Sequence, residues 1–143
     1  YGTTTGRPRR CGWFDAVAAR YAVDVAGIDA IAVTKLDILD GFETIKVVTG
    51  YRLPDGSTTD TFPADAEIAE AIEPIHEELP GWSKPTEGVV DENDLPKEAK
   101  DYLEYLEEKL GVPAVIVSTG PRREETLVRG NTELADRLRG IIT

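Results

Sequence analysis

The stretch AIAVTKLDILDG, residues 30–41, decides how the rest of the chain is interpreted. Its segment from Ile31 to Thr34 is short and nearly all apolar, which is typical of a strand buried on both faces of a sheet. The strand then ends in Thr34-Lys35-Leu36-Asp37, which places a cation and a carboxylate two residues apart. These charges either mark the point where the strand reaches water or belong to a strand end that presents them to a ligand.

The composition is that of one acidic globular domain. The chain has 143 residues, of which 41% are hydrophobic and 30% charged, enough for a single domain with its own core. The net charge of −11 argues against a nucleic-acid surface, because phosphate binding requires positive charge. The single cysteine, Cys11, excludes an internal disulfide and a cysteine-based zinc site, and it fits a reducing, cytoplasmic setting. No segment approaches the roughly 18 apolar residues of a membrane span. Because Tyr1 is not an initiator methionine, we expect the chain to begin inside a longer gene product or after processing.

The spacing of apolar residues predicts an α/β fold, with a small, mostly buried sheet and flanking helices. Helices are expected over residues 13–25, 65–71 and 132–142. A further helix is expected to be opened by Leu95-Pro96 and capped by Gly111, with Tyr102, Leu103, Leu106 and Leu110 on its inner face. Strands are expected over residues 31–34, 44–53 and 114–117, with 58–62 able to return as a hairpin partner. Residues 36–41 are predicted to form a turn, and the proline- and glycine-rich residues 74–93 to be irregular.

A second polar segment, Ser118-Thr119-Gly120, follows another apolar strand. In open α/β sheets, ligands bind at the carboxyl ends of strands. The Asp37 carboxylate suits guanine, because it accepts two hydrogen bonds and guanine offers two adjacent donors that adenine lacks. The Lys35 stem can lie along the base, and backbone N–H groups of Ser118 to Gly120 can close its far side. Charged residues at the end of a single strand more often only mark where the chain leaves the sheet for solvent. The presence of two such strand ends favours a ligand site.

The opening loop TTTGRPRR, residues 3–10, is a second candidate site. Threonine hydroxyls and backbone N–H groups of a turn suit a carboxylate or phosphate, and arginine binds the same anions with two prongs. Gly6 allows the backbone to approach a ligand closely, and Pro8 stiffens the loop. The alternative interpretation is a frayed basic terminus.

Four blocks of the chain resemble the C-terminal part of the adenylosuccinate synthetase family, in the same order and spacing. They are YGTTTGRPRRCGWFDAVAARYA (1–22), VTKLDILDGFETIKV (33–47), EPIHEELPGW (73–82) and YLEYLEEKLGVPAVIVSTGP (102–121). The resemblance runs to about residue 128, whereas the tail GNTELADRLRGIIT does not look like the family's usual ending. We therefore expect a single domain over 1–143, with a substrate loop (1–10), an α/β body (11–130) and an atypical tail (131–143).

The resemblance implies a cytoplasmic, homodimeric ligase that joins IMP and L-aspartate into adenylosuccinate during purine nucleotide biosynthesis, using GTP and Mg²⁺. It implies no nucleic-acid or membrane partner. The residues that it assigns to aspartate and IMP are Thr3, Thr4, Thr5, Gly6, Arg7 and Arg9. The residues that it assigns to GTP are Arg9, Lys35, Leu36, Asp37, Ser118, Thr119 and Gly120.

The family's phosphate-binding glycine loop, catalytic base and catalytic histidine lie in its N-terminal part, and this sequence has no glycine-rich phosphate loop. We therefore expect no catalytic or metal-binding residue here, and a sheet that continues into the rest of a larger, P-loop-like α/β enzyme. His76 is expected to be structural or exposed, and the pairs Glu77-Glu78 and Glu107-Glu108 to be solvated faces. The chain alone is predicted to be inactive. The alternatives are a free-standing guanine-nucleotide-binding module and a folding domain whose sites are vestigial.

Overall fold

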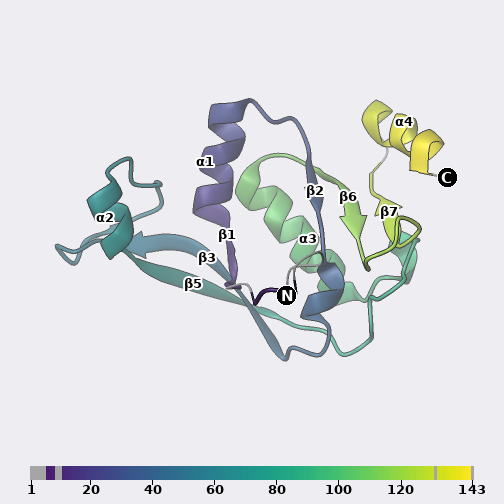
Figure 1. The fold of residues 1–143 in the computed structure, drawn as a ribbon, viewed down its shortest axis with the longest axis horizontal. Helices are drawn as coiled ribbons and strands as arrows, with labels where there is room; N and C mark the ends of the chain where they lie inside the picture. The colour runs from purple at the N-terminus through teal and green to yellow at the C-terminus, as the bar shows by residue number, and fades with distance from the viewer. Residues whose placement is uncertain (1–5, 9–10, 131, 143) are drawn as a thin grey trace.

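The computed structural model describes residues 6–8, 11–130 and 132–142, and it confirms an α/β fold (Figure 1). The strands form two small mixed sheets. The first sheet contains β1 (Phe14–Asp15), β3 (Thr44–Arg52), β4 (Thr58–Thr59) and β5 (Glu73–Pro80), and the second contains β2 (Ile31–Val33), β6 (Ala114–Ser118) and β7 (Thr126–Val128). The helices are α1 (Ala16–Ala26), α2 (Ala66–Ala71), α3 (Lys97–Leu110) and α4 (Glu133–Ile142), with 3-10 turns η1 (Leu36–Leu39) and η2 (Glu92–Asp94).

Helix α1 is capped at both ends. Asp15 accepts a hydrogen bond from the Ala18 backbone N–H at 2.9 Å, which satisfies a donor of the first turn. Gly27 ends the helix in the left-handed conformation with φ 63°, where a residue with a Cβ would be strained. The helix begins three residues later than predicted, because Phe14 and Asp15 instead pair in parallel with Val47 and Val48 of β3.

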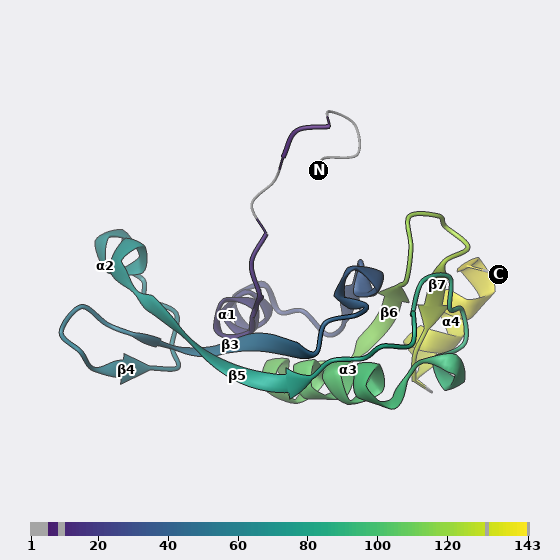
Figure 2. The ribbon, with the colours of Figure 1, turned by 90° about the horizontal axis from the view of Figure 1, so that it is seen from below.

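Helix α3 joins the two sheets into one core. Its buried side chains are Ala99, Tyr102, Leu103, Leu106 and Leu110, which include all four that the spacing predicted for the inner face. They belong to one cluster with Ile45 and Val47 of the first sheet and Val117 of the second. Figure 2 shows α3 running beneath both sheets. Gly111 ends the helix with φ 74°, as predicted.

The expected irregular structure over residues 74–93 is wrong for its first part. Residues 73–80 form strand β5, which pairs antiparallel with β3 from Thr44↔Pro80 to Arg52↔Glu73. Its two prolines lie at or next to the strand ends, where a missing N–H costs the ladder little. Only residues 81–91 are irregular. The turn expected at 36–41 begins as the 3-10 turn η1, and the hairpin partner β4 is shorter than the predicted 58–62.

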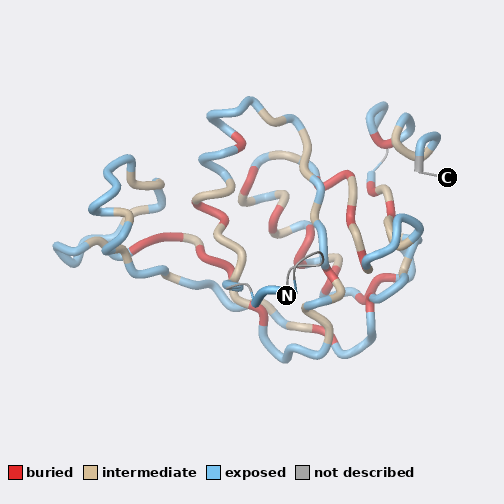
Figure 3. Tube along the Cα trace, viewed as in Figure 1, coloured by how far each residue is buried: buried red, intermediate tan, exposed pale blue. Residues whose placement is uncertain are grey.

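Strand β2 is more exposed than its apolar sequence predicts. Ala32 is exposed and Ile31 and Val33 are only half-buried, although a strand buried on both faces was expected. The physical reason is that, within the described residues, β2 pairs with β6 alone and forms the edge of its sheet. The neighbouring β6 is largely buried, as predicted (Figure 3).

Candidate functional site

The two polar strand ends singled out in the sequence lie side by side. Strands β2 and β6 run parallel, and their register pairs Val33 with Val117. Thr34, directly after β2, and Ser118, the last residue of β6, therefore lie at the same end of this strand pair. Parallel strands place their carboxyl ends together, and this is the edge at which α/β sheets commonly bind ligands.

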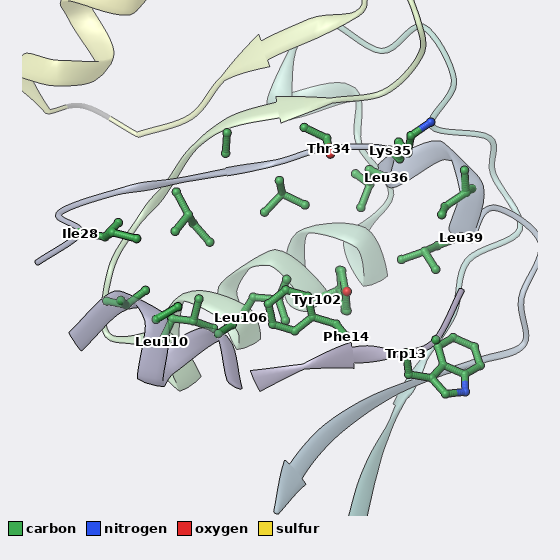
Figure 4. A pocket seen from close by; sticks show the side chains of 18 residues that line it. Trp13, Phe14, Ile28, Thr34, Lys35, Leu36, Leu39, Tyr102, Leu106 and Leu110 are labelled. Atoms are coloured by element: carbon green, nitrogen blue, oxygen red, sulfur yellow. The ribbon is translucent and has the colours of Figure 1, made fainter. Parts of the chain in front are cut away.

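The first strand end makes an unusual turn at Lys35. Its φ of 62° lies in the left-handed region, and no other non-glycine residue among those described has a positive φ. Such a conformation costs about 1–3 kcal/mol and persists only where the surroundings fix it. Leu36 supplies part of that anchoring, because it is 1% exposed and belongs to the core. Leu36 and Leu39 point toward an apolar groove between α1, β2, η1 and α3, whereas the Lys35 ammonium group points away from it (Figure 4).

Asp37 carries an oxygen that lacks a hydrogen-bond partner. Its Oδ1 is closed off from solvent and accepts no hydrogen bond from any residue the structure describes, although the residue as a whole is partly exposed. A shielded carboxylate oxygen without a donor is costly, since water has been lost without replacement. A donor that reached this oxygen would remove that cost.

The second strand end is held by its own hydrogen bonds. Thr119 is fully buried, its N–H donates to Glu125 O at 2.9 Å, and its hydroxyl donates to Val89 O at 2.8 Å. The Ser118 hydroxyl donates to Gly120 O at 2.9 Å. A Cβ on Gly120 would meet Glu125 Oε2 at 2.3 Å, so a larger residue here would have to displace the Glu125 side chain. The buried Thr119 therefore stabilises this turn through its hydrogen bonds.

The opening loop is only partly described. Thr3, Thr4, Thr5 and Arg9 lie outside the described residues. Gly6 has a φ of +60°, which agrees with the need for glycine there, and Arg7 is exposed. Residues 6–8 lie away from the helices and sheets (Figure 2), so the structure does not bring them to the strand ends.

A groove of about 460 Å³ lies beside the first strand end. It runs between α1, β2, η1 and α3, and its walls are mostly apolar (Figure 4). Trp13, Ile28, Ala32 and Leu110 contribute to it, whereas Asp37 does not line it. Side chains of this kind suit packing against another apolar surface more than binding a charged ligand.

The acidic pairs and the single histidine are placed mainly as expected. His76 is exposed on β5, and Glu78 and Glu108 are exposed. Glu77 accepts a hydrogen bond from the Tyr105 hydroxyl. Glu107 departs from the expectation of a solvated face, because it is half-buried and its Oε1 binds both Arg129 and the backbone N–H of Ala114.

Sequence reasoning missed the loop of residues 82–90, which contacts both strand ends. Thr86 is fully buried and bonds to Asp40, directly after η1, while Val89 accepts the Thr119 hydroxyl. The only local signal is Asp40-Gly41, a common turn pair, which gives no indication of a partner 46 residues away.

No metal site is apparent within residues 6–8, 11–130 and 132–142, because no three His, Cys, Asp or Glu side chains there are placed to hold an ion. In the same ranges, every helix is too short or too polar to cross a bilayer.

Together, a parallel strand pair that presents a lysine, a carboxylate and a glycine turn at one edge has the features of a nucleotide-binding α/β domain. Comparison with known proteins gives the family. Residues 1–127 match the sequence profile of adenylosuccinate synthetase, and the chain therefore belongs to the adenylosuccinate synthetase family.

Individual relatives agree with that assignment. The chain is 55% identical over 131 residues to the adenylosuccinate synthetase of Chromohalobacter salexigens, covering 92% of this chain and 30% of the relative. It is 52% identical over 125 residues to that of Aquifex aeolicus, covering 87% of this chain and 29% of the relative. A structure of fully ligated adenylosuccinate synthetase from Plasmodium falciparum superposes with a TM-score of 0.83 at 36% identity, covering 91% of this chain and 31% of that one. The chain thus spans about a third of the length of these relatives.

Proposed function

We propose that this chain is the C-terminal part of a synthetase that joins IMP and L-aspartate with GTP and Mg²⁺, and that its two strand ends bind the guanine base. The observation that carries the proposal is the Asp37 carboxylate, which has a shielded oxygen without a donor and lies at the edge shared with Ser118 to Gly120.

Guanine satisfies this carboxylate better than adenine. Its N1–H and exocyclic N2–H are adjacent donors, and the two carboxylate oxygens of Asp37 can accept both. An adenine base would leave the carboxylate unpaired, which is the costly arrangement. The aliphatic stem of Lys35 covers one face of the base. Since the Thr119 N–H is already bonded to Glu125, the Gly120 N–H is the donor proposed for the far side of the base.

The opening loop is proposed to bind the other substrates. Thr3, Thr4, Thr5, Gly6, Arg7 and Arg9 would hold aspartate, with Arg7 also contacting IMP and Arg9 also contacting GTP. Guanidinium groups bind carboxylates and phosphates in a two-pronged geometry. They would also offset the negative charge that builds up while GTP phosphorylates the IMP 6-oxygen, before the aspartate amine displaces that phosphate.

We further propose that the chain is incomplete as a catalyst. It spans about 30% of its relatives, and strand β2 has an apolar sequence but an open edge beside the groove. Both features fit a surface against which the remainder of a synthetase packs, and we place the phosphate loop, the catalytic base and the Mg²⁺ ligands in that remainder. Dimerisation and substrate turnover would then belong to the whole enzyme.

Two measurements test this proposal. The 143-residue chain, incubated with IMP, GTP, Mg²⁺ and aspartate, should form no adenylosuccinate above the no-enzyme control, and turnover would contradict its incompleteness. Isothermal calorimetry with GDP tests the base site. Binding that Asp37→Ala abolishes would support the site, whereas binding that Asp37→Ala leaves unchanged would refute it.

The free-standing guanine-nucleotide module remains the second candidate function. Two observations favour it. The hydroxyl and N–H of Thr119 are both hydrogen-bonded within this chain, and Leu36 is buried in its core, so residues of this chain hold both strand ends. Tight GDP binding by the isolated chain, without turnover, would favour the module. Weak binding that strengthens when the remainder of a synthetase is supplied would favour the incomplete enzyme.

A further inference from the structure

The loop of residues 82–90, here called the bridging loop, begins with a three-bond connection to the first strand end. The Asp40 carboxylate accepts hydrogen bonds from Trp82 Nε1 at 2.6 Å, from the Thr86 hydroxyl at 2.8 Å and from the Thr86 N–H at 2.8 Å. Trp82 is 3% exposed and Thr86 is fully buried, so these bonds are shielded from water. Hydrogen bonds to a charged acceptor in such surroundings are among the stronger ones in proteins.

Asp40 is in turn bonded to the backbone of Asp37, whose carboxylate is the candidate guanine-binding group. Its own N–H donates to the backbone oxygen of Asp37 at 3.1 Å, which closes η1. At the start of the turn, the Ile38 N–H donates to Lys35 O at 3.3 Å. Short 3-10 turns have poor hydrogen-bond geometry, and this one begins at a strained Lys35. The bonds from Trp82 and Thr86 to Asp40 therefore add a restraint on Asp37 from outside the turn.

The other end of the bridging loop holds the second strand end. The Thr119 hydroxyl donates to Val89 O at 2.8 Å, and the Gly88 N–H donates to Thr119 O at 3.2 Å. Thr119 is fully buried, like Thr86. The Val89 N–H in turn donates to Thr86 O at 3.1 Å. A continuous path of hydrogen bonds thus runs from Asp37 through Asp40, Thr86 and Val89 to Thr119.

We propose that Thr86 is a positioning residue for base recognition. Through Asp40 and Thr119 it fixes the separation between the Asp37 carboxylate and the Ser118–Gly120 turn. This inference rests on the proposed guanine site, and it adds a residue that does not itself touch the nucleotide. Without the Thr86 hydroxyl, η1 relaxes from its strained geometry, and Asp37 no longer faces a base held by the glycine turn.

The variant Thr86→Val tests the inference, because it keeps the side-chain shape and removes only the hydroxyl. We expect GDP affinity to fall about tenfold or more, the loss typical of one hydrogen bond to a charged group. We also expect faster amide hydrogen exchange at Ile38, Asp40 and Gly88, with unchanged exchange at Leu103 in the core. Thr86→Ser restores the hydroxyl and should return both quantities to near wild-type values. This rescue separates a positioning role from a general loss of packing.

Thr59→Val is the matched control. It removes another threonine hydroxyl, one that accepts only a local bond from the Thr61 N–H at 3.1 Å, and it should change neither quantity. Thr86→Val with wild-type affinity and exchange would overturn the inference and leave the guanine site intact. Failure of the wild-type chain to bind GDP would overturn the guanine site and the recognition role together. In that case the exchange rates still show whether Thr86 restrains η1.

Discussion

Arg129 and Glu107 form a shielded ion pair, with Arg129 Nη1 lying 2.9 Å from Glu107 Oε1. The same guanidinium binds Glu92 Oε1 through Nε at 2.7 Å, and its side chain is only 7% exposed. Glu107 Oε1 also accepts the Ala114 N–H at 2.7 Å. One arginine directly after β7 therefore connects helix α3, the 3-10 turn η2 and the start of β6.

Removing this arginine should destabilise the domain strongly. Arg129→Met removes the hydrogen bonds of a buried guanidinium to two half-buried carboxylates, and we expect a loss of about 1.5–3 kcal/mol in the free energy of unfolding measured with urea. The control is Arg137→Met, whose pair with Glu133 is exposed and should cost less than about 1 kcal/mol. Equal losses in the two variants would contradict the distinction between a buried and an exposed pair.

The chain leaves no room for a side chain at Gly81. A Cβ there would lie 1.8 Å from the backbone oxygen of Phe42, and backbone cannot move aside as a flexible side chain can. We expect Gly81→Ala to cost about 2 kcal/mol or more, measured by thermal and urea unfolding. Gly12→Ala is the control, because no atom lies within 4 Å of the position that its new methyl group would occupy. Wild-type stability of Gly81→Ala would show that the β3–β5 connection is looser than the structure indicates.

The contact between Glu77 and Tyr105 should make stability depend on pH in the acid range. The Tyr105 hydroxyl donates to the Glu77 carboxylate and lowers its pKa below the usual 4.5, and Lys109 acts in the same direction. Because the folded pKa lies below the unfolded one, this contribution is present above the unfolded value. It is lost as the pH falls through the folded value.

The measurement is the urea midpoint of wild type and of Glu77→Gln between about pH 3 and pH 7. Wild type should be the more stable above pH 4.5, and the difference should shrink as the pH falls. Glu78→Gln is the control, since Glu78 forms only an exposed pair with Lys46. A difference that grows toward low pH would mean that the sign of the shift is wrong.

The parts of the fold that sequence predicted depend on local rules. Helix α3 was recognisable because its apolar residues recur every three or four positions and Gly111 follows them. The end of α1 at Gly27 is likewise a local signal, because glycine is favoured where a helix stops. Sequence also placed the two polar strand ends correctly, since each directly follows an apolar strand.

The parts that sequence missed depend on distant partners. Strand β5 was hidden by Pro74 and Pro80, and only its pairing with β3 shows that both prolines are tolerated. The bond between Asp40 and Thr86 joins residues 46 positions apart, and no local pattern indicates it. The exposure of β2 depends on what lies beside its open edge, which an apolar sequence cannot specify.

The most direct test of the central claim is the base preference of the Asp37 site. Equilibrium affinities for GDP and ADP are measured on wild type, on Asp37→Asn and on the exposed control Asp24→Asn. We expect wild type and the control to prefer GDP by about 100-fold or more, and Asp37→Asn to lose most of that preference, because the amide presents a donor where guanine requires an acceptor. Equal affinity of wild type for GDP and ADP, or an unchanged preference in Asp37→Asn, would contradict the account.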